Sequence, residues 1–286
     1  MFRTRFIRLL PAFFLLIALA STTMPAFALG RKVTKIVIDA GHGGKDPGAR
    51  GAFTTEKELT LAIAMRVGKM IQDSMRDVQV VYTRTTDIFP SLSERHEIAN
   101  KSNADLFISI HINATAGRTE RIQSGTKTVG KGRKKRTIPV YRTVNHRETS
   151  TSGTETYVLG LHRNDQKEGA IGEYSEQVTD EPGLLNPSDP QTAIVIAQYS
   201  QAFFGRSVNL GTKIQDAFAA QGRTDLGVKQ KGLEVLAGSA MPGVLVECGF
   251  INNSDEEAYM SSASGQTQIA HAIYRGIKAY KAETER

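Results

Sequence analysis

The chain has 286 residues, a formal net charge of +7, one cysteine and no tryptophan. A single cysteine excludes a small disulfide-stabilised scaffold, so stability must come from a hydrophobic core, which this length readily supplies. The charge is uneven, because residues 115–152 hold ten Lys or Arg against two Glu. A basic balance confined to one low-complexity segment does not indicate a nucleic-acid-binding protein.

The N-terminus has the layout of a secretory signal peptide. Three arginines precede an apolar run from Leu9 to Ala20, and residues 25–28 supply an Ala-x-Ala cleavage site. The apolar run is too short for a stable membrane span, and nothing later in the chain is long and apolar enough. We therefore predict a signal peptide over residues 1–28 and a mature chain over 29–286 with no transmembrane segment, exported to a periplasm or secreted.

Apolar spacing in the first half predicts strands alternating with helices. Strands are expected over residues 35–40, 78–83 and 105–110. A helix capped by Thr54 or Thr55 follows the first strand, and a second helix, with the capping-box pair Ser91 and Glu94, spans residues 91–101.

The second half is less regular. Residues 115–152 are expected to form a solvated, mobile basic loop, with attraction to an anionic envelope polymer or membrane surface as the functional alternative. Residues 163–190 are acidic and show no sustained period. Strands are predicted over 154–159 and 243–246, a short extended piece over 231–236, and helices over 191–220, with a break near Gly205, and 266–281. Alternating strands and helices predict a single α/β domain with a mostly parallel sheet flanked by helices on both faces.

Four side chains that can bind a metal or carry a proton are expected near the carboxyl ends of the predicted strands. His42, His111 and Glu247 each follow a strand, and Glu56 opens the first helix. In parallel sheets, ligands collect beyond the carboxyl ends of the strands. Two imidazoles, one carboxylate and a water form a four-coordinate zinc site, and the second carboxylate remains as a proton carrier. The pattern therefore points to metal-assisted hydrolysis.

Neighbouring residues offer alternatives. Glu58 lies two positions after Glu56, so it faces another direction on the helix and competes poorly as a ligand. Cys248 is better read as a buried structural residue than as a nucleophile. Asp46 is expected to organise the turn after His42, with a hydrogen bond to that histidine as the alternative. His162 is retained as a candidate substrate-pocket residue.

Several motifs, in order along residues 35–280, resemble those of the zinc-dependent N-acetylmuramoyl-L-alanine amidases of the cell-separation type. They are IVIDAGHGGKDPGARG, TEKELTLAIA, YTRTTDIFPSLSERHEIAN, LFISIHINA, SGTETYVL and VLVECGFINN. The resemblance implies zinc held by His42, Glu56 and His111, Glu247 as the catalytic carboxylate, and a mostly parallel sheet of about six strands. The basic insert over residues 115–152 is not part of the family's core pattern.

The resemblance also implies a function. Such an enzyme cleaves the amide between N-acetylmuramic acid and the L-alanine of the peptidoglycan stem peptide, in cell-wall remodelling and daughter-cell separation. Two alternatives stay open: a zinc carboxypeptidase or endopeptidase acting within the stem peptide, and a non-catalytic wall-binding module.

Residues 163–190 occupy the place where some members of this family carry a regulatory helix. There the helix blocks the zinc until an activator protein withdraws it. In that case Glu173, Glu176 or Glu181 would fill the open metal position. An ordinary surface connection is the alternative.

Overall fold

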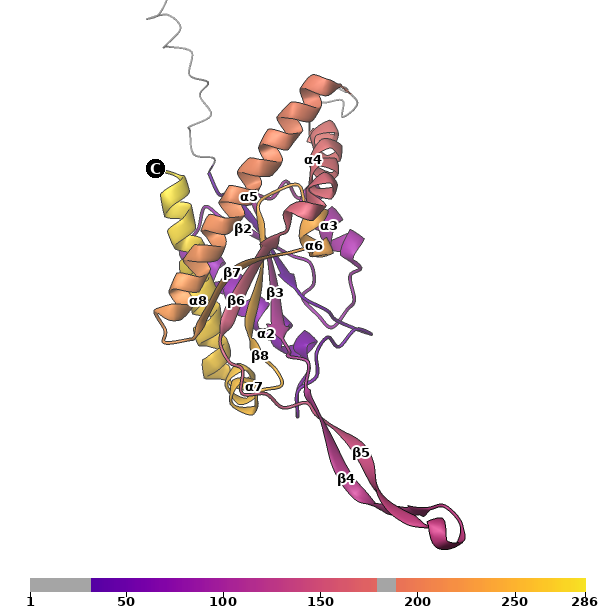
Figure 1. Ribbon diagram of the computed structural model, residues 1–286. Coiled ribbons are helices and arrows are strands. Elements are labelled where there is room, and N and C mark those ends of the chain that lie inside the picture. The colour runs from indigo at the N-terminus through magenta and orange to yellow at the C-terminus, as the bar shows by residue number, and fades with distance from the viewer. Residues whose placement is uncertain (1–31, 179–188) are drawn as a thin grey trace, which may run out of the picture.

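The computed structural model describes residues 32–178 and 189–286, so the predicted signal peptide lies outside the described residues. A six-stranded sheet forms the centre of the molecule (Figure 1), in the order β2-β1-β3-β8-β6-β7. Its strands are β1 (Lys35–Ala40), β2 (Gln79–Tyr82), β3 (Leu106–Asn113), β6 (Thr154–Leu159), β7 (Asp225–Lys231) and β8 (Gly243–Phe250). The first four in the sheet order run parallel, while β6 is antiparallel to β8 and parallel to β7. This arrangement confirms the predicted α/β class with a mostly parallel sheet.

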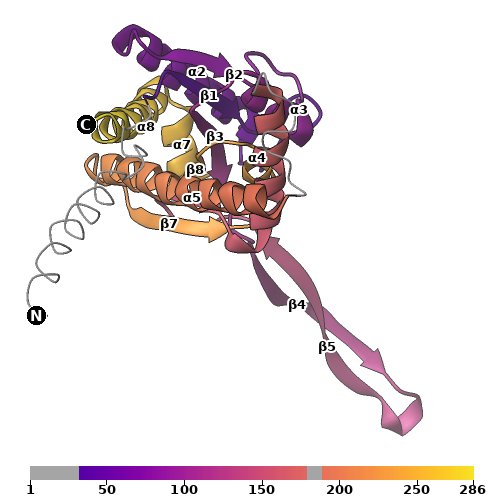
Figure 2. The same cartoon turned by 90° about the horizontal axis from the view of Figure 1, so that it is seen from above.

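Helices cover both faces of the sheet (Figure 2). The larger core lies against α2 (Glu56–Ser74), α5 (Pro190–Ala219) and α8 (Ala263–Thr284), and the smaller core lies against α3 (Leu92–Lys101) and α6 (Glu234–Ala237). Alternate residues of a strand point to opposite faces. Ile36 and Ile38 of β1 therefore enter the larger core and Val37 enters the smaller one. The remaining described helices are α4 (Asn164–Val178) and α7 (Ser254–Ser261).

Several predicted elements need correction. Helix α4 lies where no regular structure was expected. Among the α4 side chains that the structure describes, only Ala170 and Ile171 are apolar and buried, and they leave little periodic signal. Helix α5 continues through Gly205 without a break. The extended piece expected over 231–236 is instead the end of β7 followed by α6.

The basic segment does not form the expected irregular loop, so that prediction was wrong. It folds into an antiparallel hairpin of β4 (Arg118–Val129) and β5 (Arg136–His146), which projects from the body of the protein (Figures 1 and 2). The sequence signal for β5 was weak, because the many charged residues of this segment obscure the alternate spacing of Ile138, Val140 and Val144. Among the helices that the structure describes, none is both long and apolar enough to cross a membrane.

A buried ion pair supports the carboxyl end of β1. Asp39 is fully buried and accepts hydrogen bonds from Thr83 Oγ1 (2.6 Å), Ser109 Oγ (2.6 Å) and Arg95 Nη1 (2.5 Å). Arg95 also donates to the carbonyl of His42 (2.7 Å), so the pair holds the turn that carries this histidine. Burial opposes the charge, but Arg95 and the three hydrogen bonds outweigh it and hold the pKa of Asp39 below its ordinary value.

Replacing Arg95 with methionine is expected to lower the free energy of unfolding by about 3–5 kcal/mol, because Asp39 is left as an uncompensated buried charge. Urea denaturation at neutral pH measures this, with the exposed Arg76→Met as control. Since the pKa of Asp39 is depressed by folding, its contribution is present above the unfolded pKa of about 4 and is lost at lower pH. The difference in the free energy of unfolding between variant and parent should therefore become smaller below about pH 4. Equal stability of the two proteins at neutral pH would contradict a stabilising role for the Asp39–Arg95 pair.

Candidate metal centre and active site

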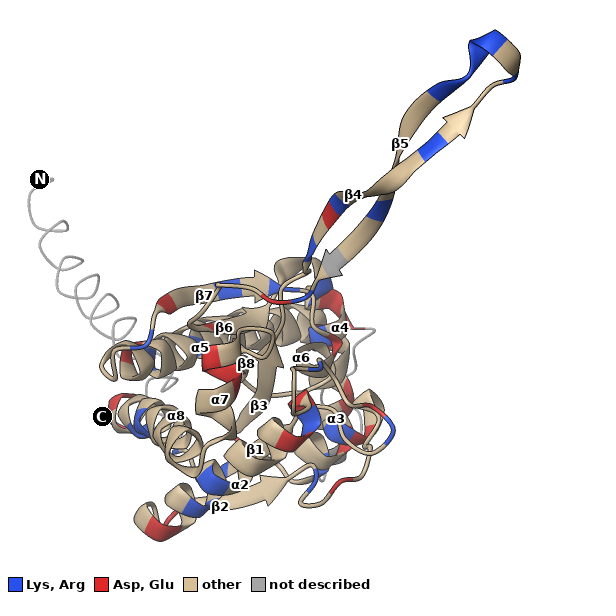
Figure 3. Ribbon diagram, turned by 90° about the horizontal axis from the view of Figure 1, so that it is seen from below, with Lys and Arg blue, Asp and Glu red and all other residues tan. Residues whose placement is uncertain are grey.

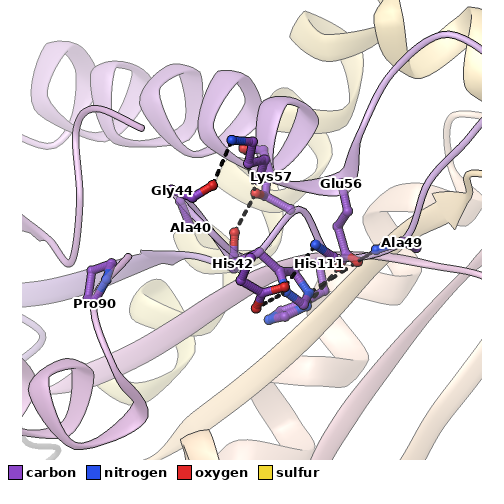
Figure 4. Close-up of polar contacts among 12 residues, drawn as sticks. Ala40, His42, Gly44, Ala49, Glu56, Lys57, Pro90 and His111 are labelled. Atoms are coloured by element: carbon purple, nitrogen blue, oxygen red, sulfur yellow. Dashed lines mark hydrogen bonds and ion pairs between the residues drawn. The ribbon is translucent and has the colours of Figure 1, made fainter. Parts of the chain in front are cut away.

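Three of the predicted site residues meet at the carboxyl ends of β1 and β3 (Figure 4). His42 Nε2 lies 3.1 Å from Glu56 Oε2, and His111 Nδ1 lies 2.9 Å from Glu56 Oε1. The two imidazole rings stand edge to face with centroids 4.9 Å apart. One ligand atom from each residue lies within 4.8 Å of the other two, so these side chains can share a single cation.

Glycines allow this close approach. A Cβ on Gly41 would lie 2.5 Å from the ring of His111, and a Cβ on Gly48 would lie 2.5 Å from Glu56 Oε2. His42 itself has a φ of 60°, a left-handed conformation that is uncommon outside glycine. The glycine-rich turn is therefore needed to bring the ligand side chains together.

The first turn of α2 separates the roles of its two glutamates. The Glu58 carboxylate accepts from Thr55 N (2.9 Å) and Thr55 Oγ1 (2.7 Å), so it caps the helix. Glu56 is buried and accepts from the backbone N–H groups of Ala49 (2.8 Å) and Ile112 (3.0 Å). Its carboxylate is thus held between the two histidines, as the sequence predicted, and Glu58 is excluded.

The charges around this cluster suit a cation. Burial opposes the ionised form of Glu56, but hydrogen bonds and charges from His111 and His42 prevail and hold its pKa far below the ordinary value. Burial also opposes the charge on His42, yet Glu56 and then Asp46 raise its pKa to about 9. The Asp46 carboxylate lies 2.8 Å from His42 Nδ1, which leaves Nε2 directed at Glu56. Two imidazoles and two carboxylates in this arrangement fit a divalent cation.

Glu247 lies beside the cluster on the same face of the sheet. It pairs in register with His111 of β3 on one side and with Glu155 of β6 on the other. Its Oε2 is buried and has no hydrogen-bond partner among the described residues. Burial raises the pKa of Glu247 to about 7; the charge on His111 opposes this shift, while Glu56 and Glu155 add to it. A carboxyl group of this kind can accept and release a proton near neutral pH.

Glu155 was not predicted as a site residue. It is buried and accepts hydrogen bonds from Asn113 Nδ2 (2.5 Å), Tyr157 OH (2.7 Å) and Lys229 Nζ. The available signal was a charged residue near the start of an otherwise apolar and threonine-rich strand. Both carboxylate oxygens of Glu155 accept hydrogen bonds, whereas Oε2 of Glu247 has no partner among the described residues. Glu155 is therefore a supporting residue, and Glu247 is the candidate proton carrier.

A cleft of about 370 Å³ opens beside the two histidines. His42 and His111 line the cleft, and its apolar lining is formed by Phe89, Leu92, Leu233, Val235 and Leu245. A larger hollow of about 680 Å³ lies between α3 and α4, but none of its lining residues belongs to the cluster. The smaller cleft is therefore the better substrate site.

Comparison with known proteins agrees with this geometry. A family model of N-acetylmuramoyl-L-alanine amidases matches residues 36–279. The chain belongs to this amidase family. It is 32% identical over 250 residues to the amidase AmiC of Escherichia coli, covering 87% of this chain and 53% of AmiC. It is 30% identical over 256 residues to AmiA of the same species, covering 88% of this chain and 76% of AmiA.

Solved structures place the fold in the same family. An N-acetylmuramoyl-L-alanine amidase from Clostridium difficile 630 superposes with a TM-score of 0.57 at 25% sequence identity, covering 87% of this chain and 97% of that one. The family consists of metal-dependent hydrolases. The present chain spans about half the length of AmiC and of a related AmiB from Haemophilus influenzae.

The described helix of the segment considered for regulation, α4, does not reach the metal cluster of this amidase-family chain. Glu173 lines the hollow between α3 and α4, and the neighbouring Tyr174 OH bonds Asn103 Oδ1 (2.9 Å), which precedes β3 at the end of the sheet opposite the cluster. The side chain of Glu176 and all of Glu181 lie outside the described residues. Glu173 therefore does not fill a metal position in this structure, while the blocking carboxylate expected from Glu176 or Glu181 stays a prediction.

The structure also describes two other sequence candidates. His162 packs against Gly160 and Gly232 and does not line this cleft, so its place in a substrate pocket stays a prediction. Cys248 is fully buried, and burial raises the pKa of its thiol far above the ordinary value. It remains a protonated structural residue, as expected.

Proposed function

We propose that this chain is a zinc-dependent N-acetylmuramoyl-L-alanine amidase that cleaves the amide between N-acetylmuramic acid and the L-alanine of the peptidoglycan stem peptide. His42, Glu56 and His111 would hold the zinc, since two imidazoles and one carboxylate with an open position are typical of catalytic zinc sites. The observation that carries the proposal is the unpartnered Oε2 of Glu247 next to three convergent ligand atoms.

The chain's own residues account for the proton movements of this hydrolysis. Zinc, when bound, polarises the substrate carbonyl and makes water more acidic. Glu247 takes the proton of the attacking water on a carboxylate oxygen and returns it to the departing alanine nitrogen. The water oxygen joins the carbonyl carbon as the carbon–nitrogen bond breaks, so the products are a lactyl carboxylate and a free amine. The apolar walls of the cleft exclude other water from the reacting groups.

The products of peptidoglycan digestion test this function. Purified peptidoglycan is incubated with the protein, with and without a chelator, and the soluble products are identified by mass. Release of intact stem peptides that a chelator abolishes is the expected result. Shortened stem peptides would instead indicate a carboxypeptidase or endopeptidase, and a zinc-free protein that binds peptidoglycan without releasing products would indicate a wall-binding module.

Replacing Asp46 with asparagine is expected to weaken zinc binding by about 10–100-fold, because the negative charge that orients His42 and increases its basicity is lost. Competition with a chromophoric chelator measures the affinity. The exposed Asp73→Asn serves as control and should bind zinc as the parent does. An unchanged affinity for Asp46→Asn would show that this aspartate only shapes the turn.

We also propose that the protein acts outside the cytoplasm, in a periplasm or after secretion, in wall remodelling and daughter-cell separation. The signal-peptide pattern of residues 1–28 supports export. Regulation by an activator protein that acts on residues 163–190 is part of this proposal, and α4 itself is anchored to α6 and to the turn before β8. Lys167 of this helix is buried and donates to the carbonyls of Leu236 (3.2 Å) and Met241 (2.7 Å) and to Ser239 Oγ (3.1 Å).

A further inference from the structure

The β4–β5 hairpin concentrates positive charge on a narrow projection (Figure 3). Residues 118–146, here called the basic ribbon, contain nine Lys or Arg and one Glu, and all nine cationic side chains are exposed. The glutamate, Glu120, pairs with Arg118 (3.5 Å) and with His146 (3.0 Å). Within the described parts of the chain, the other eight cations form no ion pair. The ribbon therefore presents unneutralised positive charge.

The strand register places most of this charge on one face. Directly paired residues of an antiparallel ribbon share a face, and alternate residues along a strand do so too. By this rule Arg118, Lys127, Arg136 and Arg142 lie on the same face. Among the cations within the two strands, only Arg121 lies on the opposite face. The cations thus form a row along the ribbon, and four more follow at its tip.

The same face carries five β-branched apolar residues, which are half-buried: Ile122, Val129, Ile138, Val140 and Val144. Three of them lie opposite a basic residue, as Ile122 does opposite Arg142 and Ile138 does opposite Lys127. The aliphatic stems of Arg and Lys can cover such neighbours while their charged ends remain in water. This packing favours a folded ribbon with its charges directed outward.

The root of the ribbon is fixed beside the candidate active site. Four residues separate its first strand, which begins at Arg118, from the end of β3 at Asn113, and β3 also carries His111. Asn252, in the turn after β8, donates through Nδ2 to the carbonyls of Thr115 (3.1 Å) and Arg147 (2.6 Å), one on each leg of the root. The ribbon therefore leaves the body from the same edge of the sheet as the metal cluster.

We propose that the basic ribbon binds the carboxylates of peptidoglycan stem peptides next to the one being cleaved, and so holds the polymer at the active site. This inference rests on the proposed function. Stem peptides bear free carboxylates, so a peptidoglycan strand is a linear polyanion. Twelve residues in β4 span about 40 Å. A row of cations of that length, starting at the edge of the sheet that carries the metal cluster, matches an extended anionic chain better than a small ligand.

An anionic membrane is the main alternative partner, and the composition of the ribbon disfavours it. Proteins that rest on bilayers usually place aromatic anchors on the face that meets the lipid. The ribbon contains neither Trp nor Phe. Its one tyrosine, Tyr141, lies on the face opposite the row of cations, with the Arg121 guanidinium 4.9 Å from its ring centroid.

Two charge-matched variants of the full chain test the proposal. The ribbon variant replaces five cations with glutamine: Lys127, Lys131, Lys134, Arg136 and Arg142. The control variant replaces five exposed cations of the body with glutamine: Lys69, Arg76, Lys101, Arg275 and Lys278. Both variants lose the same net charge. Cosedimentation with purified peptidoglycan at low salt should show about tenfold weaker binding for the ribbon variant and nearly unchanged binding for the control.

High salt should remove most of the difference, since screening weakens interactions between exposed charges. Equal binding of the two variants would overturn the proposal, as would a ribbon variant that loses binding only to vesicles of phosphatidylglycerol and phosphatidylcholine. Cleavage of a short soluble muropeptide keeps the two proposals separate. All three proteins should cleave it equally, because it is too short to reach the ribbon. A parent that binds peptidoglycan through the ribbon but cleaves nothing would refute the amidase function alone.

Discussion

A Glu247→Gln variant is expected to bind zinc as tightly as the parent protein but to cleave the muramyl–alanine amide about 10²–10⁴-fold more slowly. Glutamine preserves the shape of the side chain but cannot accept the proton of the attacking water. Glu247 makes no contact that fixes the three ligands to one another, since those bonds run through Glu56. Metal content by mass spectrometry and initial rates on a soluble muropeptide measure the two properties separately.

A matched control for this variant is Glu283→Gln, on the exposed end of α8, which should retain both zinc and activity. If the zinc-loaded Glu247→Gln protein kept full activity, another group would have to carry the proton. Glu155 would be the first to examine, because it lies opposite Glu247 in the sheet. Loss of zinc from Glu247→Gln would instead make Glu247 a ligand.

A His42→Ala variant is expected to lose both zinc and activity. Two ligands, Glu56 and His111, would remain, and two-residue sites bind zinc far more weakly than three-residue sites. We expect at least about a hundredfold loss of affinity and no measurable hydrolysis at equimolar metal. The fold should persist, because His42 is partly exposed and belongs to neither hydrophobic core.

His271→Ala serves as the control, since this histidine is exposed on α8 and is not a member of the candidate ligand group. Circular dichroism confirms folding of both variants, and chelator competition gives their zinc affinities. A His42→Ala protein that takes up one zinc with parental affinity would remove His42 from the ligand set, and the geometry at Glu56 would then need another explanation.

Elements with a strong local signal were predictable. The parallel strands β1, β3 and β8 are short apolar runs buried on both faces, and the helix boundaries near Thr55, Ser91 and Asp189 follow from their capping side chains. The hairpin and α4 were missed because their stability depends on cross-strand pairing or on packing against α5, and neither leaves a clear period in a charged sequence.

The grouping of His42, Glu56, His111 and Glu247 was predictable from the chain, because each stands at the end of a short apolar run or at a helix start, and a parallel sheet gathers polar groups near the carboxyl ends of its strands. Their chemistry also required contacts between distant segments. Only the folded protein shows that Asp46 orients His42, that Glu155 is satisfied while Glu247 Oε2 is not, and that the basic segment is an ordered ribbon rooted at Asn252. Hydrogen-bond satisfaction and strand register are properties of neighbours in space, which spacing along the chain does not encode.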